Sequence, residues 1–201
     1  AGTITGDATL VMSGIEAVSN GFGSGGSGIQ IDQNGASAIT GDASATFSDI
    51  VASFNEEHGI LIGGDGAKVW MTGNASLVLT DVATVGNLGG NSGIHIDGNG
   101  ASSVTGDAYT AFGNIDTSYN VGSGVYIGGN GASTITGMAT TLFLGNINAS
   151  NNGANGIQID GNGAFAVSGT AIFAMAAISS DDPFVGGAIS LDNNDNGLVI
   201  G

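Results

Sequence analysis

Apolar side chains alternate with polar or small ones in short runs along most of the chain. Ala43, Ala45 and Phe47 are separated by single residues, and after a short break Ile50, Ala52 and Phe54 repeat the alternation. A period of two is typical of a β-strand with alternate side chains facing inward. No stretch carries the sustained apolar stripe with a period of 3.6 residues that marks an amphipathic helix. The pattern therefore predicts an all-β protein.

A short unit, Gly-Ile-x-Ile followed by Asp or Gly, recurs with small variations. It occupies residues 28–32, 59–63, 93–97, 124–128, 156–160 and 188–192, so successive copies are 31–34 residues apart. A period of this length indicates a solenoid or a propeller, but a propeller blade usually takes about 40–50 residues. In a β-solenoid, equivalent positions of successive coils stack about 4.8 Å apart, so each becomes a column of like side chains. The repeated columns favour the solenoid.

Two columns are predicted to define the coil. The core ladder of aliphatic residues is Ile15, Ile50, Val82, Ile115, Ile147 and Ile178. The corner ladder is mostly asparagine, and Asn-Gly pairs suit corners that need a positive φ. Its members are Asn34, Asp65, Asn99, Asn130, Asn162 and Asn194.

A further polar column mixes Asp with neutral residues, which favours a structural corner over a row of metal ligands. Uniform carboxylates at this spacing would repel one another. The column contains Asp7, Asp42, Asn74, Asp107, Met138 and Thr170.

The Gly-Ile-x-Ile-Asp/Gly units, the Asn-Gly pairs that follow and the trailing Thr-Gly-Asp-Ala pattern resemble right-handed parallel β-helix repeat proteins. The resemblance covers essentially the whole chain. It implies one domain, residues 1–201, forming a right-handed parallel β-helix of about six coils. Because this group includes polysaccharide lyases, phage tailspikes, adhesins and autotransporter passengers, the resemblance specifies a fold more closely than a function.

The composition of the chain excludes several classes of binding partner. Lys68 is the single Lys or Arg and the formal net charge is −16, so binding to nucleic acid is effectively excluded. The same charge disfavours polyanionic substrates and anionic membrane surfaces. No cysteine is present for disulfides or thiolate metal sites, and no apolar run approaches the ~20 residues of a membrane span. Membrane insertion is therefore not expected.

Few residues are candidates for catalysis or metal binding. Asp181-Asp182, the one adjacent Asp pair, could do acid–base work on a glycoside but is interpreted as a solvated turn. The local cluster Glu56-Glu57-His58 is interpreted as a polar loop end, and His95 as outward-facing between two inward isoleucines. By resemblance, β-helix pectin-degrading enzymes hold substrate carboxylates with Arg or Lys, and this chain lacks Arg. We expect no enzymatic activity, with a polysaccharide lyase or glycoside hydrolase as the alternative.

One segment fits the first six places of a calcium loop, D-x-[DN]-x-[DN]-G. It makes Asp192, Asn194 and Asn196 the calcium candidates, although Gly201 ends the sequence before a twelfth-position Glu. We expect no cofactor, with calcium as the alternative.

The leading hypothesis is a structural extracellular or cell-surface β-solenoid that forms a stiff fibre, stalk or adhesin shaft. The absence of a visible cap predicts either covalent continuation of the repeat or head-to-tail self-association. Such a shaft could bind a carbohydrate or a host surface. The alternative is a carbohydrate-binding or carbohydrate-cleaving β-helix, with Tyr126, Trp70 and Tyr109 as sugar platforms.

Overall fold

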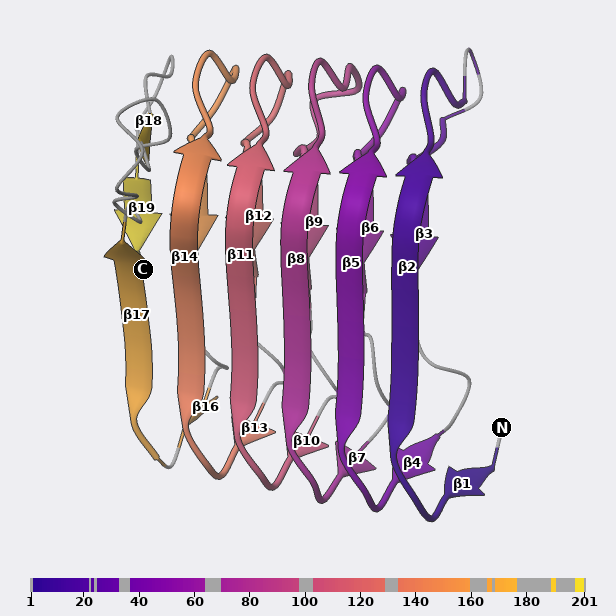
Figure 1. The fold of residues 1–201 in the computed structure, drawn as a ribbon, viewed down its shortest axis with the longest axis vertical. Coiled ribbons are helices and arrows are strands. Elements are labelled where there is room, and N and C mark those ends of the chain that lie inside the picture. The colour runs from indigo at the N-terminus through magenta and orange to yellow at the C-terminus, as the bar shows by residue number, and fades with distance from the viewer. Residues whose placement is uncertain are drawn as a thin grey trace.

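The computed structural model describes residues 2–21, 23, 25–32, 37–63, 70–97, 103–128, 134–159, 166–167, 169–176, 189–190 and 198–200. These residues form β-strands joined by turns, and none of them lies in a helix. Within the same ranges, no helix is present that could cross a membrane. The strands stack side by side in chain order, from the first coil to the last (Figure 1).

The strands form three sheets, and each coil contributes one strand to each sheet. The first sheet contains two-residue strands: β1 (Thr3–Ile4), β4 (Ala38–Ile39), β7 (Trp70–Met71), β10 (Ser103–Val104), β13 (Thr134–Ile135) and β16 (Ala166–Val167). The second sheet contains the long strands: β2 (Ala8–Glu16), β5 (Ala43–Val51), β8 (Ala75–Ala83), β11 (Ala108–Asp116), β14 (Ala139–Asn148) and the shorter β17 (Ala171–Ala176). The third contains three-residue strands: β3 (Ile29–Ile31), β6 (Ile60–Ile62), β9 (Ile94–Ile96), β12 (Val125–Ile127), β15 (Ile157–Ile159) and β19 (Leu198–Ile200).

Every pairing between these strands is parallel and joins equivalent positions of successive coils. Ala43 of β5 pairs with Ala8 on one side and with Ala75 on the other, and the same alanine column continues through β11, β14 and β17. A parallel sheet requires a crossover between neighbouring strands, and here the rest of the coil provides it. The prediction of an all-β, parallel β-solenoid is confirmed.

The regular part of the solenoid is shorter than the predicted six coils. Four coils, β4–β6, β7–β9, β10–β12 and β13–β15, have a described neighbour on both sides in all three sheets. The first coil, β1–β3, is paired on one side only. In the last coil the additional strand β18 (Ile189–Ser190) pairs with β14 alongside β17.

The core is a stack of the predicted aliphatic positions. Ile50, Val82, Ile115 and Ile147 are at most 2% exposed and pair in register through the second sheet, whereas Ile15 in the first coil is half-buried. Phe112 and Phe143 stack with ring centroids 4.4 Å apart. Ile178, the last predicted member, lies outside the described residues. The core therefore runs continuously along the axis.

The predicted register of the last coil is wrong. Residues 188–192 were aligned with the Gly-Ile-x-Ile unit, but Ile189 pairs with Ile147 of the long-strand sheet. The third sheet is instead continued by Leu198–Ile200, which pairs with Ile157–Ile159. Val199, the middle residue of this strand, pairs with Gln158. Ile-Ser-Leu and Leu-Val-Ile both place apolar residues two apart, so alternation alone does not distinguish them.

The predicted orientation of Phe54 is also wrong. The alternation placed it inward after Ile50 and Ala52, but its side chain is 52% exposed and its backbone has a φ of 57°. A left-handed residue ends the strand alternation and turns the chain. Phe54 therefore marks a corner of the coil and not its core.

Glycine in the repeated unit is required by the close approach of neighbouring coils. A Cβ on Gly93 would lie 2.7 Å from Asn120 Nδ2 and 2.9 Å from the backbone oxygen of Gly124, both in the next coil. Gly59 and Gly124 face the same restriction from the coil that follows them. These contacts explain why a Gly precedes the third-sheet strand in coil after coil.

Candidate functional site

A buried ladder of asparagines joins the coils at the turn after the long strands. The backbone N–H and the side-chain Nδ2 of Asn87 both donate to Asn120 Oδ1, at 3.0 and 2.8 Å. Asn55 makes the same pair of bonds to Asn87, and Asn120 to Asn152. Asn20 begins the series by donating to Asn55. The buried side chains of Asn55, Asn87 and Asn120 thus each bond to both neighbouring coils, and an unpaired group there would be costly.

The residue before each of these asparagines creates the turn. Ser19, Phe54, Gly86, Tyr119 and Asn151 all have φ between 57° and 71°. Their side chains have little in common, so this column gives no compositional signal. The asparagine that follows is constant, because its amide must fit between the two neighbouring coils.

The corner ladder predicted from the sequence is a different set of residues from this buried ladder. Asn34, Asp65, Asn99, Asn130, Asn162 and Asn194 all lie outside the described residues. The buried ladder was not identified from the sequence, although its signal was present. Its members recur at intervals of 35, 32, 33 and 32 residues, which is the period of the repeat.

The mixed Asp column also connects coils. Asp7 Oδ1 accepts the backbone N–H of Asp42, and Asp42 Oδ1 accepts that of Asn74. The series continues from Asn74 to Asp107 and from Asp107 to Met138, with donor–acceptor distances of 2.7–2.9 Å throughout. Each acidic or amide side chain is therefore used within the stack.

The two histidines, interpreted separately from the sequence, lie together. Their rings have centroids 4.5 Å apart at an angle of 71°, and the His95 ring also contacts Tyr126 of the next coil at 4.6 Å. His95 Nε2 lies 2.8 Å from Asp97 Oδ1, and His58 Nδ1 accepts the backbone N–H of Ser92 at 3.2 Å. His95 Nδ1 is buried without a partner. These residues line a hollow of about 260 Å³ with Gly90 and Asn91.

Burial lowers the pKa of His58 below its ordinary value, and the neighbouring His95 lowers it further. Glu57 and Asp97 act in the opposite direction and do not outweigh burial. His58 is therefore held as the neutral imidazole at neutral pH. Of Glu56-Glu57-His58, the cluster singled out in the sequence, Glu56 faces the first coil, where its Oε2 accepts the N–H of Gly25.

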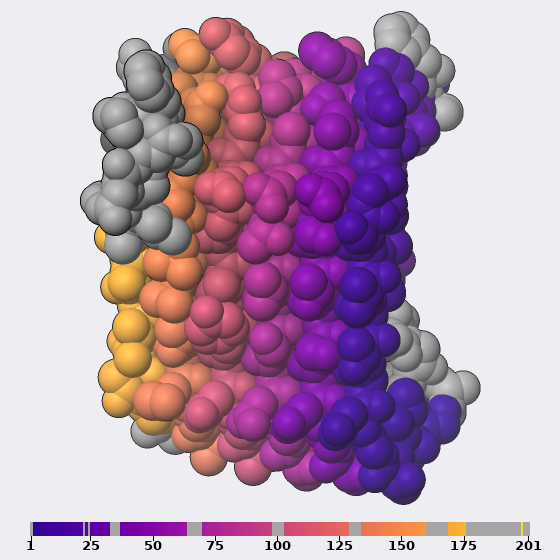
Figure 2. Space-filling model, viewed as in Figure 1, coloured from indigo at the N-terminus to yellow at the C-terminus, as the bar shows by residue number. Residues whose placement is uncertain are grey.

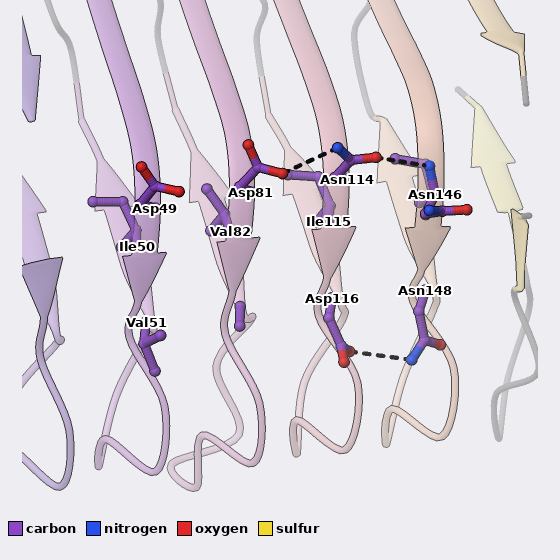
Figure 3. Close-up of a pocket in the computed structure, with 12 residues that line it drawn as sticks. Asp49, Ile50, Val51, Asp81, Val82, Asn114, Ile115, Asp116, Asn146 and Asn148 are labelled. Carbon is purple, nitrogen blue, oxygen red and sulfur yellow. Dashed lines mark hydrogen bonds between the residues drawn. The ribbon is translucent and has the colours of Figure 1, made fainter. Parts of the chain in front are cut away.

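A groove of about 600 Å³ crosses four coils on the outside of the long-strand sheet (Figure 3). Each coil contributes one triplet of residues: 49–51, 81–83, 114–116 and 146–148. One edge carries Asp49, Asp81, Asn114 and Asn146, and the other carries Val51, Ala83, Asp116 and Asn148 (Figure 3). The groove runs along the solenoid axis, because equivalent residues of successive coils line it.

The groove is hollow because each long strand contains a bulge. Asp49, Asp81 and Asn114 have φ between 53° and 55°, and the side chains of Ser48 and Thr80, before the first two, also face outward. Asp and Asn tolerate this left-handed conformation better than most residues. The bulge bends the strand and leaves a concave line along the outer face of the sheet. Figure 2 shows the molecule from the side of this sheet, with successive coils side by side.

Hydrogen bonds between coils order the polar edges of the groove. Asn114 Nδ2 donates to Asp81 Oδ1, and Asn114 Oδ1 accepts the backbone N–H of Asn146. On the opposite edge Asp116 Oδ1 accepts from Ser118 Oγ at 2.6 Å and from Asn148 Nδ2 at 3.2 Å. The groove thus offers carboxylate and amide groups in rows spaced by one coil.

The remaining candidates do not converge on one site. Trp70 lies on β7, Tyr109 on β11 and Tyr126 on β12, which belong to three different sheets, so these aromatic rings form no single platform. Asp181, Asp182, Asp192, Asn194 and Asn196 lie outside the described residues. Within the described ranges, no group of three or more His, Cys, Asp or Glu side chains is arranged to hold a metal ion.

No protein-family model matches the chain, and neither the curated proteins nor the solved structures contain a significant match to it.

Proposed function

We propose that this β-solenoid is a structural element, a stiff segment of an extracellular or cell-surface fibre, stalk or adhesin shaft. The observation that carries the proposal is the repetition of the same inter-coil bonds along the axis. The Asn20–Asn152 ladder, the Asp7–Met138 column and three parallel sheets connect each described coil to the next. Bending the rod requires several of these ladders to be strained together.

Head-to-tail self-association would extend the rod. Among the described residues, the first coil has a sheet neighbour on one side only, and Leu10, Met12 and Ile15 are half-buried there. Inside the solenoid, equivalent positions are covered by a coil on each side, as at Phe47, which lies between Met12 and Leu79 and is fully buried. A coil from a second copy would bury the same apolar surface and pair the same backbone groups.

Electron microscopy with matched variants tests this proposal. Met12→Glu places a charge on the half-buried face of the first coil, whereas Val11→Glu places one on the outward face of the same strand, where Val11 is 66% exposed. We expect fibres with an axial spacing of ~4.8 Å for the natural chain and for Val11→Glu, and separate particles for Met12→Glu. Separate particles for all three proteins at every concentration would refute self-association.

The groove supports a second candidate function, the binding of a linear neutral glycan along the rod. Carboxylate and amide groups can bond the hydroxyls of a sugar chain. One row of them runs along the axis from Asp49 to Asn146, and Asp116 and Asn148 add two more on the opposite edge. The net charge of −16 opposes an anionic glycan.

A substitution that fills the groove tests whether it binds a glycan. Ala83→Trp would occupy the hollow, and Ser44→Trp adds the same side chain to the long-strand sheet outside it. We expect a neutral oligosaccharide identified on a glycan array to lose binding to Ala83→Trp and to retain it with Ser44→Trp, as measured by calorimetry. Equal binding to both variants, or no binding by the natural chain, would remove the groove as the site.

A further inference from the structure

Ser92 is bonded to the neighbouring coil by a titratable side chain. At this corner backbone donors are commonly accepted by carbonyl groups of an adjacent coil, as in Gly28 N–H to His58 O and Ile60 N–H to Gly93 O, both at 2.9 Å. The N–H of Ser92 instead donates to Nδ1 of His58, in the equivalent position one coil earlier. The second and third coils are therefore joined here through an imidazole ring.

This bond exists only while His58 is neutral. Nδ1 accepts a hydrogen bond with its lone pair, so the proton of the neutral ring is on Nε2. Protonation places hydrogen on both ring nitrogens, and Nδ1 can then no longer accept from Ser92. The backbone N–H of Ser92 would lose its partner at the same time.

The surroundings of His58 oppose its protonation. The His95 ring lies against it, with Asp97 at 2.8 Å from His95 Nε2 and Tyr126 on the far side of His95. Burial is the main cause that lowers the His58 pKa, whereas Glu57, which precedes His58 in the chain, and Asp97 act to raise it. Since the Asp97 side chain is 58% exposed, water screens much of its charge.

We infer that His58 is an acid-sensitive link between the second and third coils. At neutral pH it holds the segment before β9 against the preceding coil, and in mild acid the link opens. The opening is local, because Leu88 N–H still donates to Asn55 O and Gly93 N–H to Ser123 O on either side of Ser92. A rod built from such coils would loosen at this corner without losing its core.

Amide hydrogen exchange followed by NMR tests the link on the intact chain. Protection of the Ser92 amide, corrected for the intrinsic pH dependence of exchange, should fall about tenfold per pH unit from about 6.5 down to the pKa of His58. The Asn87 amide, which donates to Asn120 Oδ1, serves as a non-titrating control and should keep its protection.

Two variants separate the link from a general loss of stability. In His58→Phe, Ser92 should exchange quickly at every pH. In His95→Gln, the His58 pKa rises and the loss of protection moves to higher pH. The inference is overturned if Ser92 protection follows that of Asn87 while the imidazole resonances show His58 titrating. It is equally overturned if His58 stays neutral down to the pH at which the whole chain unfolds.

Discussion

Asn87 is bonded on both sides within the buried ladder, so its removal affects two neighbouring coils. In Asn87→Ala, the backbone N–H and Nδ2 of Asn55 lose their acceptor, and Asn120 Oδ1 loses the Nδ2 donor but keeps the backbone N–H of residue 87. Each unsatisfied buried group costs about 1–3 kcal/mol, so we expect the free energy of unfolding to fall by about 3 kcal/mol. Urea denaturation measures the loss.

Asn146→Ala is the matched control for this prediction, because Asn146 is exposed at the edge of the groove. It should change the free energy of unfolding by less than about 0.5 kcal/mol. Similar losses in the two variants would mean that the buried ladder contributes no more than a surface amide does.

His58 gives stability a defined pH dependence. Its pKa is lower in the folded chain than in the unfolded chain, chiefly because it is buried, so the unfolded state binds more protons between the two values. Its contribution to stability is therefore unaffected above about pH 6.5 and becomes increasingly unfavourable as the pH falls toward the folded-state pKa. Urea unfolding of the natural chain and of His58→Phe at several pH values isolates this contribution, because the other titrating groups are common to both. A constant difference between them from pH 8 to pH 5 would contradict the prediction.

The bulge in each long strand depends on residues that accept a positive φ. Asp81 has a φ of 55°, and a β-branched side chain in this conformation costs about 1–2 kcal/mol. We expect Asp81→Val to lower the free energy of unfolding by that amount, while Asp81→Gly stays within about 1 kcal/mol of the natural chain. Thr80→Val, the same side chain one residue earlier, controls for the loss of a polar group. If Asp81→Val and Thr80→Val were equally stable, the bulge would not require a left-handed residue.

The long strands were predictable because two signals agree at each position. Alternation identifies the strand, and the column of Ala8, Ala43 and Ala75 fixes its register against the next coil. The Asn55–Asn87 pair was missed because an exposed corner was expected to carry the asparagines, and a conspicuous Asn-Gly column already occupied that role. The register of β18 was predicted incorrectly because Ile189-Ser190 satisfies the alternation of two different sheets. Side-chain contacts between coils, such as His58 with His95, depend on the exact stacking and not on any pattern within one repeat.

The charge of the whole molecule bears on its dependence on salt. A formal net charge of −16 with one Lys and no Arg leaves the carboxylates to repel one another along the rod. The screening length falls from about 30 Å at 0.01 M salt to about 8 Å at 0.15 M. We therefore expect the melting temperature, and the extent of fibre formation, to rise over this range of NaCl.

Matched ionic strength distinguishes general screening from a calcium site. If only screening operates, CaCl2 and MgCl2 at the ionic strength of the NaCl series should stabilise the chain equally. A larger shift with CaCl2 alone would instead indicate specific binding, for which Asp192, Asn194 and Asn196 are the sequence candidates. Calorimetric titration of calcium into the natural chain and into Asp192→Asn would then locate the calcium site. Abolition of the calcium-specific shift by Asp192→Asn would assign the site to that loop, and persistence of the shift would place it elsewhere.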